Sequence, residues 1–206
     1  MNPAAEPPRP RARNRRGEGS RLRAEILAAA TELVDAGRDP RSLTLRAIAR
    51  TAGITAPSIY AHFLDPPAIV LGVVRQAFAE LAGRIRAALD NTGGDSRQRL
   101  YTVCRAYLEF ARRHPERYRA MFGGTWNSTA TSAELAELGA EALHLLAGCL
   151  ADCVAAGHCT STDPAADAVA LWLGLHGLAH QRAVHTSFRW PEDIVQRIAF
   201  PLSHLG

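Results

Sequence analysis

The stretch from Leu43 to Phe63 reads L-T-L-R-A-I-A-R-T-A-G-I-T-A-P-S-I-Y-A-H-F, and it decides the fold of the chain. Thr44 is a good N-cap for a short helix over 45–52. A second short helix is expected from Thr55 to about residue 63, with Pro57 tolerated in its first turn. Helices of under three turns are unstable alone in water, so these two must bury a shared apolar face.

The apolar residues of this stretch have the spacing that such a face requires. The residues expected on it are Leu45, Ile48, Ala49, Ile54, Ile59 and Phe63. Gly53 can adopt the positive φ that a tight turn between the helices needs. The pattern therefore predicts a helix-turn-helix unit. The side chains left facing outward, all able to bond phosphates or base edges, are Thr44, Arg46, Arg50, Thr55, Ser58, Tyr60 and His62.

Two strings in this unit, TLRAIARTAGIT (Thr44–Thr55) and SIYAHF (Ser58–Phe63), closely resemble the DNA-binding motif of the TetR family of bacterial regulators. The resemblance covers about residues 20–75. It implies that the chain binds a palindromic double-stranded DNA operator as a homodimer. The DNA-contacting residues that it implies are Thr44, Arg46, Thr55, Ala56, Pro57, Ser58, Tyr60 and His62.

Within that set the resemblance assigns different roles. Thr44 and Thr55 would bind phosphates at helix N-termini, Tyr60 and His62 would hold the DNA backbone, and Arg46 would read a guanine. The residues alone also allow Tyr60 to pack against the first helix and His62 to be an ordinary surface histidine.

The chain departs from the family at Pro66, where a lysine usually meets a phosphate. We hypothesise that an N-terminal arm replaces this contact by following the DNA backbone or entering a minor groove. Its arginines are Arg9, Arg11, Arg13, Arg15 and Arg16.

Helical periodicity and breakers predict an all-α fold of about nine helices. Beyond the helix-turn-helix and a helix that begins near Ser20, the expected helices are 66–90, 96–114, 115–122, 133–156, 164–186 and 191–204. We expect three regions: a disordered arginine-rich arm at 1–18, a three-helix DNA-binding domain at 19–64, and an effector-binding and dimerisation domain at 65–206.

Two strings in the carboxy-terminal region, HPERYRAMF (His114–Phe122) and WLGLHGLA (Trp172–Ala179), resemble a TetR carboxy-terminal domain of the W…HG type. That resemblance implies a cavity for a small-molecule effector. The wall residues proposed for it are Tyr107, Phe110, Phe122, Trp126, Trp172 and His176. No charged residue stands isolated among these apolar side chains, so we expect a largely hydrophobic effector.

The segment Val169–Val184 is apolar nearly all round, and such a helix should be buried on two sides. A second subunit would supply the second side. We therefore expect the homodimer to form through the helices 164–186 and 191–204, packed as an intersubunit four-helix bundle.

Charge is distributed unevenly along the chain. Residues 1–63 carry 11 Arg against 6 acidic residues, whereas residues 64–206 carry 13 Arg against 14. This asymmetry favours a polyanion as the partner of the amino end. No apolar run is long enough for a membrane helix. We expect a cytoplasmic protein with reduced cysteines, although Arg15-Arg16 superficially resembles a twin-arginine export signal.

Two alternative functions remain open at this point. A metal- or thiol-responsive regulator could use the pairs His176/His180 or Cys149/Cys153, but each pair lacks an evident third ligand. A helical small-molecule-binding enzyme would need a catalytic motif, and the sequence contains no G-x-S-x-G, P-loop or dinucleotide fingerprint. The sequence thus predicts no enzyme, no cofactor and no metal site. The resemblance to the TetR family, and no particular residue, implies that the protein is a repressor that its effector releases from DNA.

Overall fold

The structure, a computed structural model, describes residues 18–123, 131, 134 and 137–205. This part of the chain contains eight named α-helices and two short 3-10 helices, and its only β pairing is an isolated bridge between Cys159 and Leu205. The all-α prediction is confirmed. The elements are α1 (Glu18–Asp35), η1 (Pro40–Ser42), α2 (Leu45–Thr51), η2 (Ala56–Ile59), α3 (Pro66–Asp90), α4 (Ser96–Arg113), α5 (Pro115–Phe122), α7 (Ala140–Ala155), α8 (Pro164–Val184) and α9 (Ile194–Leu202).

The first part of the chain packs around an N-terminal core, which consists of the buried side chains of α1, α2, η2 and the first half of α3, together with Leu43, Phe63 and Ala120. Thr44 caps α2 as expected, because its Oγ1 accepts a hydrogen bond from the Ala47 amide at 3.2 Å. Gly53 has φ +65°, which is the conformation predicted for the turn. The helix-turn-helix is therefore held by a cap, a turn glycine and a shared apolar face.

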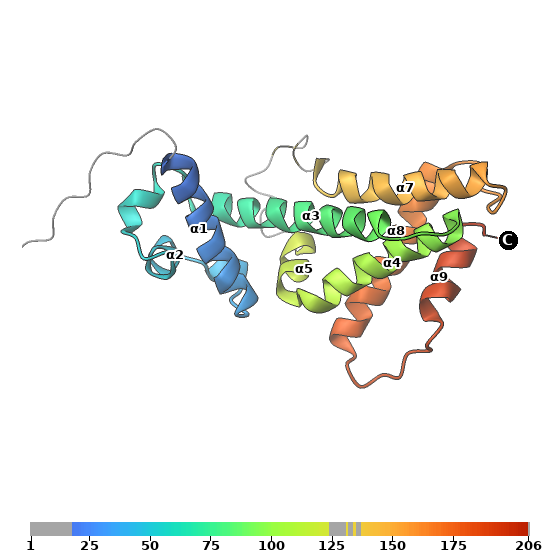
Figure 1. The fold of residues 1–206 in the computed structure, drawn as a ribbon. Helices are drawn as coiled ribbons and strands as arrows, with labels where there is room; N and C mark the ends of the chain where they lie inside the picture. Colours follow the sequence, from blue (N-terminus) through green and yellow to red (C-terminus); the bar gives the residue numbers. More distant parts are fainter. Residues whose placement is uncertain (1–17, 124–130, 132–133, 135–136, 206) are drawn as a thin grey trace, which may run out of the picture.

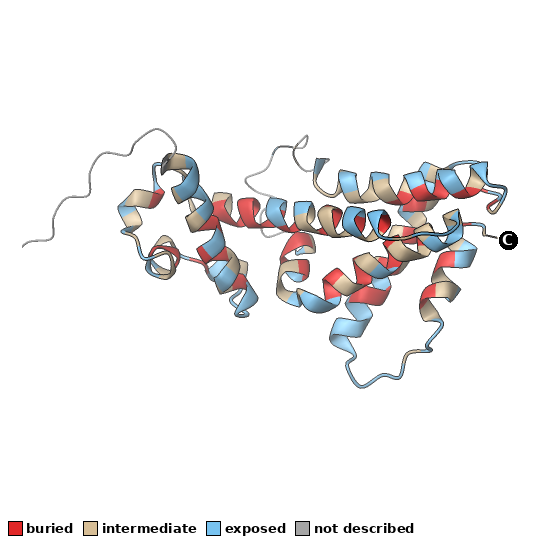
Figure 2. Cartoon of the chain, viewed as in Figure 1, coloured by how far each residue is buried: buried red, intermediate tan, exposed pale blue. Residues whose placement is uncertain are grey.

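Helix α3 connects this unit to the rest of the molecule (Figure 1). Its residues Ile69–Val74 are buried in the N-terminal core. From Ala77 to Leu89 its buried side chains join a C-terminal core, formed with the buried side chains of α4, α5, α7, α8 and α9. Figure 2 shows buried residues along both halves of α3. A single helix of 25 residues thus links the two cores.

The second helix of the motif differs from the prediction. We expected an α-helix over about 55–63, but the structure has a four-residue 3-10 helix, η2, followed by turns up to His62. Thr55 does not cap this helix, because its Oγ1 is hydrogen-bonded to the Ser58 hydroxyl at 2.8 Å. Pro57 also removes one backbone donor from the first turn. The short, tight geometry follows from these local features.

Three other boundaries differ from the sequence-based expectations. The helix expected over 133–156 is interrupted: Glu134 and Glu137 are helical, but Gly139 has φ +79°, and α7 begins after it at Ala140. The last helix is shorter than 191–204, since α9 covers Ile194–Leu202. The 3-10 helix η1 was not predicted; the Asp39 carboxylate accepts a hydrogen bond from the Arg41 amide at its start. The arginine arm up to residue 17 and Trp126 lie outside the described residues.

Helix α8 buries one face against its own protomer and exposes the other. Leu171, Leu175 and Leu178 are buried, whereas Leu173 and Val184 are 55% and 59% exposed. The apolar residues Val169 of α8 and Phe200 of α9 are exposed as well. Among the described residues, no helix combines the length and the apolar character that crossing a bilayer requires.

The crossing of α8 and α9 depends on Gly174. A Cβ at this position would lie 2.8 Å from side-chain carbons of both Ile198 and Leu202. Gly174→Ala gains helix propensity but overpacks the crossing, which costs about 1–3 kcal/mol, so we expect a net loss of about 1 kcal/mol in the free energy of unfolding. Urea unfolding at a fixed protein concentration measures this loss.

Gly148 of α7 is the matched control, because a Cβ there would have nothing within 4 Å. Gly148→Ala should stabilise the protein by about 0.5–1 kcal/mol. If Gly174→Ala is as stable as the wild type, the close approach of α8 and α9 described above is wrong.

Candidate DNA interface and effector cavity

The outward side of the helix-turn-helix carries several of the predicted DNA-contacting residues at its surface. Arg46 on α2 and Pro57 on η2 are exposed, and Ser58 is half-buried. Tyr60 is 62% exposed, which agrees with an outward role and not with packing against α2. Leu64, which follows the motif, is 86% exposed and was not singled out from the sequence.

The remaining predicted residues lie at the edges of the two short helices. Thr44 and Thr55 are exposed at the N-termini of α2 and η2, while Ala56 and His62 are half-buried. The guanidinium of Arg23 on α1 lies over the ring of Phe63, 4.8 Å from its centroid. This cation–π contact holds α1 against the end of the motif.

A cavity of about 570 Å³ lies within the C-terminal part of the molecule. Its wall consists of Phe78, Leu81, Ile85, Val103, Tyr107, Met121, Phe122, Leu138, Gly139, Ala140, Ala142, Leu143, His144, Leu146, Trp172 and Leu175. This volume suits a small organic ligand, since such sites usually measure about 300–1,000 Å³. The elements that contribute to the wall are α3, α4, α5, α7 and α8.

The structure separates the proposed wall residues into two groups. Tyr107, Phe122 and Trp172 line the cavity. Phe110 does not; it is fully buried in the C-terminal core, with its ring 5.2 Å from that of His114. His176 lies behind the wall, where it contacts three of the aromatic side chains around the cavity.

A polar cluster of Tyr107, Tyr118 and His176 stands at one side of the cavity. The two tyrosine hydroxyls lie 2.9 Å apart, and His176 Nδ1 lies 2.7 Å from the Tyr118 hydroxyl and 3.3 Å from that of Tyr107. Burial raises the pKa of Tyr107 to about 12, although hydrogen bonds with Tyr118 and Trp172 oppose this shift. Burial, with the neighbouring His180, lowers the pKa of His176. The three groups therefore form a neutral, mutually satisfied cluster at neutral pH.

The sequence analysis did not single out Tyr118, which joins Tyr107 and His176 in this cluster. It lies in the string HPERYRAMF, which resembled the family but gave no reason to choose Tyr118 over its neighbours. Phe122, four residues later, has its ring 5.6 Å from Phe78, 4.9 Å from Tyr118 and 4.5 Å from His176. Helix α5 thus supplies the centre of the aromatic cluster beside the cavity.

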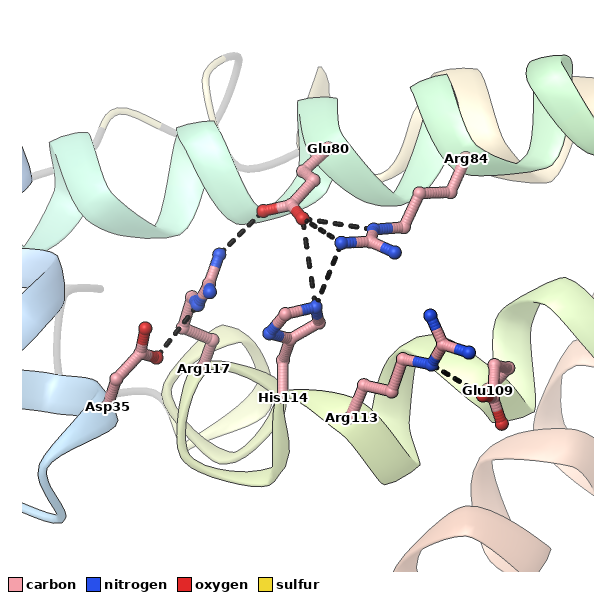
Figure 3. Close-up of polar contacts among 7 residues, drawn as sticks. All are labelled: Asp35, Glu80, Arg84, Glu109, Arg113, His114 and Arg117. Carbon is pink, nitrogen blue, oxygen red and sulfur yellow. Dashed lines mark hydrogen bonds and ion pairs between the residues drawn. The ribbon is translucent and has the colours of Figure 1, made fainter.

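The other side of α5 joins three helices through ion pairs (Figure 3). Arg117 donates from Nε to Asp35 of α1 at 2.8 Å and from Nη1 to Glu80 of α3 at 2.5 Å. Glu80 also accepts from Arg84, whose guanidinium lies 3.0 Å from His114 Nε2. The Arg117 side chain is only 17% exposed, so this contact is poorly screened by solvent.

Burial and the neighbouring charges of this junction shift the pKa values of Glu80 and His114. Burial alone would raise the pKa of Glu80, but the hydrogen bond from Arg84 and the charges of Arg117, Arg84 and His114 outweigh it and lower the pKa. Burial lowers the pKa of His114, and the nearby guanidinium of Arg117 lowers it further. The junction is thus organised around an ionised carboxylate and a neutral imidazole.

The cysteine and histidine pairs considered as metal ligands do not come together as a site. Within the described ranges, no group of three or more His, Cys, Asp or Glu side chains is placed to hold a metal ion. All four cysteines are buried free thiols. Burial raises the pKa of Cys104 to about 12 and that of Cys149 to about 11, so both stay protonated at neutral pH.

The fold and these two sites define a class of protein: helical DNA-binding regulators of transcription. The family model "Bacterial regulatory proteins, tetR family" matches residues 26–65, and the model "Tetracyclin repressor-like, C-terminal domain" matches residues 100–204. The second match alone covers half of the chain. The chain therefore belongs to the TetR family and is a DNA-binding transcriptional regulator.

Similar proteins agree with this assignment. The chain is 33% identical, over 118 residues, to the HTH-type transcriptional activator FasR of Mycolicibacterium smegmatis; the match covers 55% of this chain and 52% of FasR, so the chain spans about half the length of this curated relative.

Two solved structures illustrate the shared fold. A protein of unknown function from Rhodococcus sp. RHA1 is 26% identical, with a TM-score of 0.74 over 88% of this chain and 93% of that one. The regulator FadR from Bacillus subtilis, solved in complex with stearoyl-CoA, is 14% identical, with a TM-score of 0.65 over 87% of this chain and 95% of FadR. At that identity FadR shows the likeness of the fold alone.

The neutral imidazole of His176 generates a prediction about pH. Because the folded state lowers the pKa of His176, its contribution to stability is complete above about pH 6.5 and is lost as pH falls through the folded pKa. The wild-type melting temperature should therefore fall between about pH 7.5 and pH 5.5. His176→Gln keeps a hydrogen-bonding side chain that does not titrate, and should show a smaller fall.

His185→Gln, at an exposed position after α8, is the control. Its melting temperature should fall between about pH 7.5 and pH 5.5 by the same amount as that of the wild type. Part of the slope will persist in every variant, since burial lowers the pKa of His114 in the same direction. Identical slopes in the wild type and His176→Gln would contradict the neutral cluster.

Proposed function

We propose that this chain is an effector-controlled repressor, which binds a palindromic operator as a homodimer and is released when a largely apolar small molecule fills the cavity. The observation that carries this proposal is the position of α5. Its residues Met121 and Phe122 line the cavity, while Arg117 of the same helix is paired with Asp35 of the DNA-binding unit. Effector and operator would therefore act on one short helix.

Operator binding would use the exposed face of the helix-turn-helix. Thr44 and Thr55 stand at helix N-termini, which favour phosphates, and the exposed Arg46 can reach a guanine edge. The excess of arginine over acidic residues in residues 1–63 adds sequence-independent attraction to the DNA backbone. Tyr60 and His62 would hold phosphates beside the groove.

Dimerisation would cover the exposed face of α8 and α9. Along α8 the positions Val169, Leu173, Gly177 and Val184 are exposed, and Phe200 of α9 is 48% exposed. Apolar residues at this spacing form one stripe on a helix. A second copy presenting the same stripe would bury both, as in an intersubunit four-helix bundle.

Effector control would act through the separation of the two DNA-binding units in the dimer. Two recognition segments must lie about one helical turn of DNA apart to enter successive major grooves. An effector that prefers a different separation lowers operator affinity by its differential binding to the two shapes. We propose repression as the outcome, although the relative FasR is named an activator.

The effector would be held mainly by apolar and aromatic contacts. FadR from B. subtilis has been solved with stearoyl-CoA, and the apolar wall of this cavity would also accept an alkyl chain. A metal or thiol effector has less support, since the described thiols are buried and burial raises the pKa of Cys104 and of Cys149.

Operator binding can be tested by substitution at the proposed interface. Arg46→Ala should weaken binding to a site in the upstream region of the protein's own gene by about 5- to 100-fold, because a bidentate base contact is worth about 1–3 kcal/mol. Tyr60→Ala should also weaken it, by the loss of a phosphate contact. Fluorescence anisotropy with labelled duplexes measures both affinities.

Arg97→Ala, at an exposed position on α4, is the control and should leave operator affinity unchanged. The function is wrong if the folded wild-type dimer forms no saturable, sequence-selective complex. If Arg46→Ala and Tyr60→Ala both bind the operator as tightly as the wild type, the proposal that η2 docks in the major groove is wrong.

The coupling through α5 generates a second test, which requires no effector. Arg117→Met removes the contacts with Asp35 and Glu80 and frees the DNA-binding unit to change its angle. We expect operator affinity to fall by about 2- to 30-fold, the range of typical coupling energies. Asp35→Asn should act in the same way, and the double variant should be no worse than the poorer single one.

Arg119→Met is the matched control, because Arg119 lies on the same helix but pairs locally with Glu116. It should change operator affinity by less than about twofold, as exposed pairs contribute little. Equal effects of Arg117→Met and Arg119→Met would show that the junction does not set the position of the DNA-binding unit.

A further inference from the structure

We propose that the cavity takes an uncharged amphiphile, with an apolar body and one neutral polar group, such as an alcohol hydroxyl, that meets the hydroxyl of Tyr107. This inference rests on the proposed function, because it names the ligand class of the proposed effector cavity. It excludes fatty carboxylates, alkylammonium ions and phosphate-bearing thioesters as preferred ligands.

The wall of the cavity offers no partner for a charged head group. Among the described wall residues there is no Arg, Lys, Asp or Glu, and the one readily titratable side chain is the exposed His144 of α7. A buried ion without a counter-charge loses its hydration without compensation.

The charges beside the cavity also disfavour an anionic head group. A groove adjoins the cavity and shares Phe78, Leu138, Gly139 and Ala142 with its wall. Its charged residues are one arginine, Arg75, and three glutamates, Glu134, Glu137 and Glu141.

The arginines on this side are already paired. Arg75 is paired with Glu134, and the neighbouring Arg86 is paired with Glu141. Together these residues are three glutamates and two arginines, so a carboxylate or phosphate held at the groove would meet one more acidic than basic side chain.

The polar end of the cavity suits a neutral group that can both donate and accept. Tyr107 lines the wall, whereas Tyr118 and His176 stand behind it and bond to the Tyr107 hydroxyl. A phenol has one proton and two lone pairs, and Tyr118, His176 and Trp172 are the partners of the Tyr107 hydroxyl. The contact with His176 Nδ1 is long, at 3.3 Å, because the same nitrogen bonds the Tyr118 hydroxyl at 2.7 Å, so a ligand hydroxyl can replace it at the Tyr107 oxygen. The tautomer of His176 determines whether that position donates or accepts, and an alcohol matches either case.

Three probes with the same alkyl chain separate the head groups: 1-decanol, decanoate and decylammonium. The alcohol is used below its solubility limit and the two ions below their critical micelle concentrations, at about pH 7.5, where the acid and the amine are ionised. Isothermal titration calorimetry of the full-length dimer gives the three dissociation constants, and operator affinity is measured with and without each probe. We expect 1-decanol to bind at least about tenfold more tightly than either ion.

Tyr107→Phe tests the polar end, because it removes one hydroxyl and keeps the ring and the Tyr118–His176 bond. It should weaken the binding of 1-decanol by about three- to tenfold, because one hydrogen bond to the ligand is lost. Tyr101→Phe makes the same change on the same helix outside the cavity wall, and should leave the affinity unchanged.

The outcomes separate this inference from the proposed function. Decanoate or decylammonium that binds as tightly as 1-decanol overturns the neutral ligand class and leaves the cavity as an effector site. Selective binding of 1-decanol with unchanged operator affinity supports the ligand class and overturns effector control. If none of the three probes binds, both are overturned.

Discussion

The ion pairs of Arg117 are the contact on which the arrangement of this molecule depends. One guanidinium on α5 bonds to Asp35 of α1 and to Glu80 of α3, so three helices distant in sequence meet at one charge. Because Arg117 is mostly buried, its attraction to the two carboxylates is weakly screened, and its removal would leave those carboxylates close together. The N-terminal unit is thereby held at a defined angle to the rest of the chain.

Helix α5 is short, and its two sides have different surroundings. Arg117 and Ala120 face the N-terminal unit, whereas Tyr118, Met121 and Phe122 belong to the cavity and its polar cluster. A helix of eight residues is too short to bend between its ends, so a shift of one side moves the other. This rigidity gives the proposed effector control a physical basis, because a packed core changes between discrete arrangements and does not deform continuously.

The junction around Arg117 and the cavity lie a few residues apart along α5, but their electrostatic environments are opposite: the junction holds paired charges and the cavity side holds neutral polar groups. The junction pairs each charge with an opposite one, and its carboxylate stays ionised. Beside the cavity, burial raises the pKa of Tyr107 and lowers that of His176, so burial favours the neutral form of both groups. A charged ligand would disturb the second arrangement, and an uncharged one would leave both intact.

The sequence by itself determined the all-helical fold, the helix-turn-helix and its turn at Gly53, because helical periodicity, caps and breakers are local properties of the chain. The predicted N-cap at Thr55 was wrong, because the Thr55 hydroxyl is hydrogen-bonded to the Ser58 hydroxyl and does not cap η2. Only the tertiary structure decided that Phe110 is core, that His176 stands behind the cavity wall, and that Arg117 reaches Asp35. Those facts depend on how α1, α3, α4, α5 and α8 are oriented, and orientation results from packing between segments far apart in the chain.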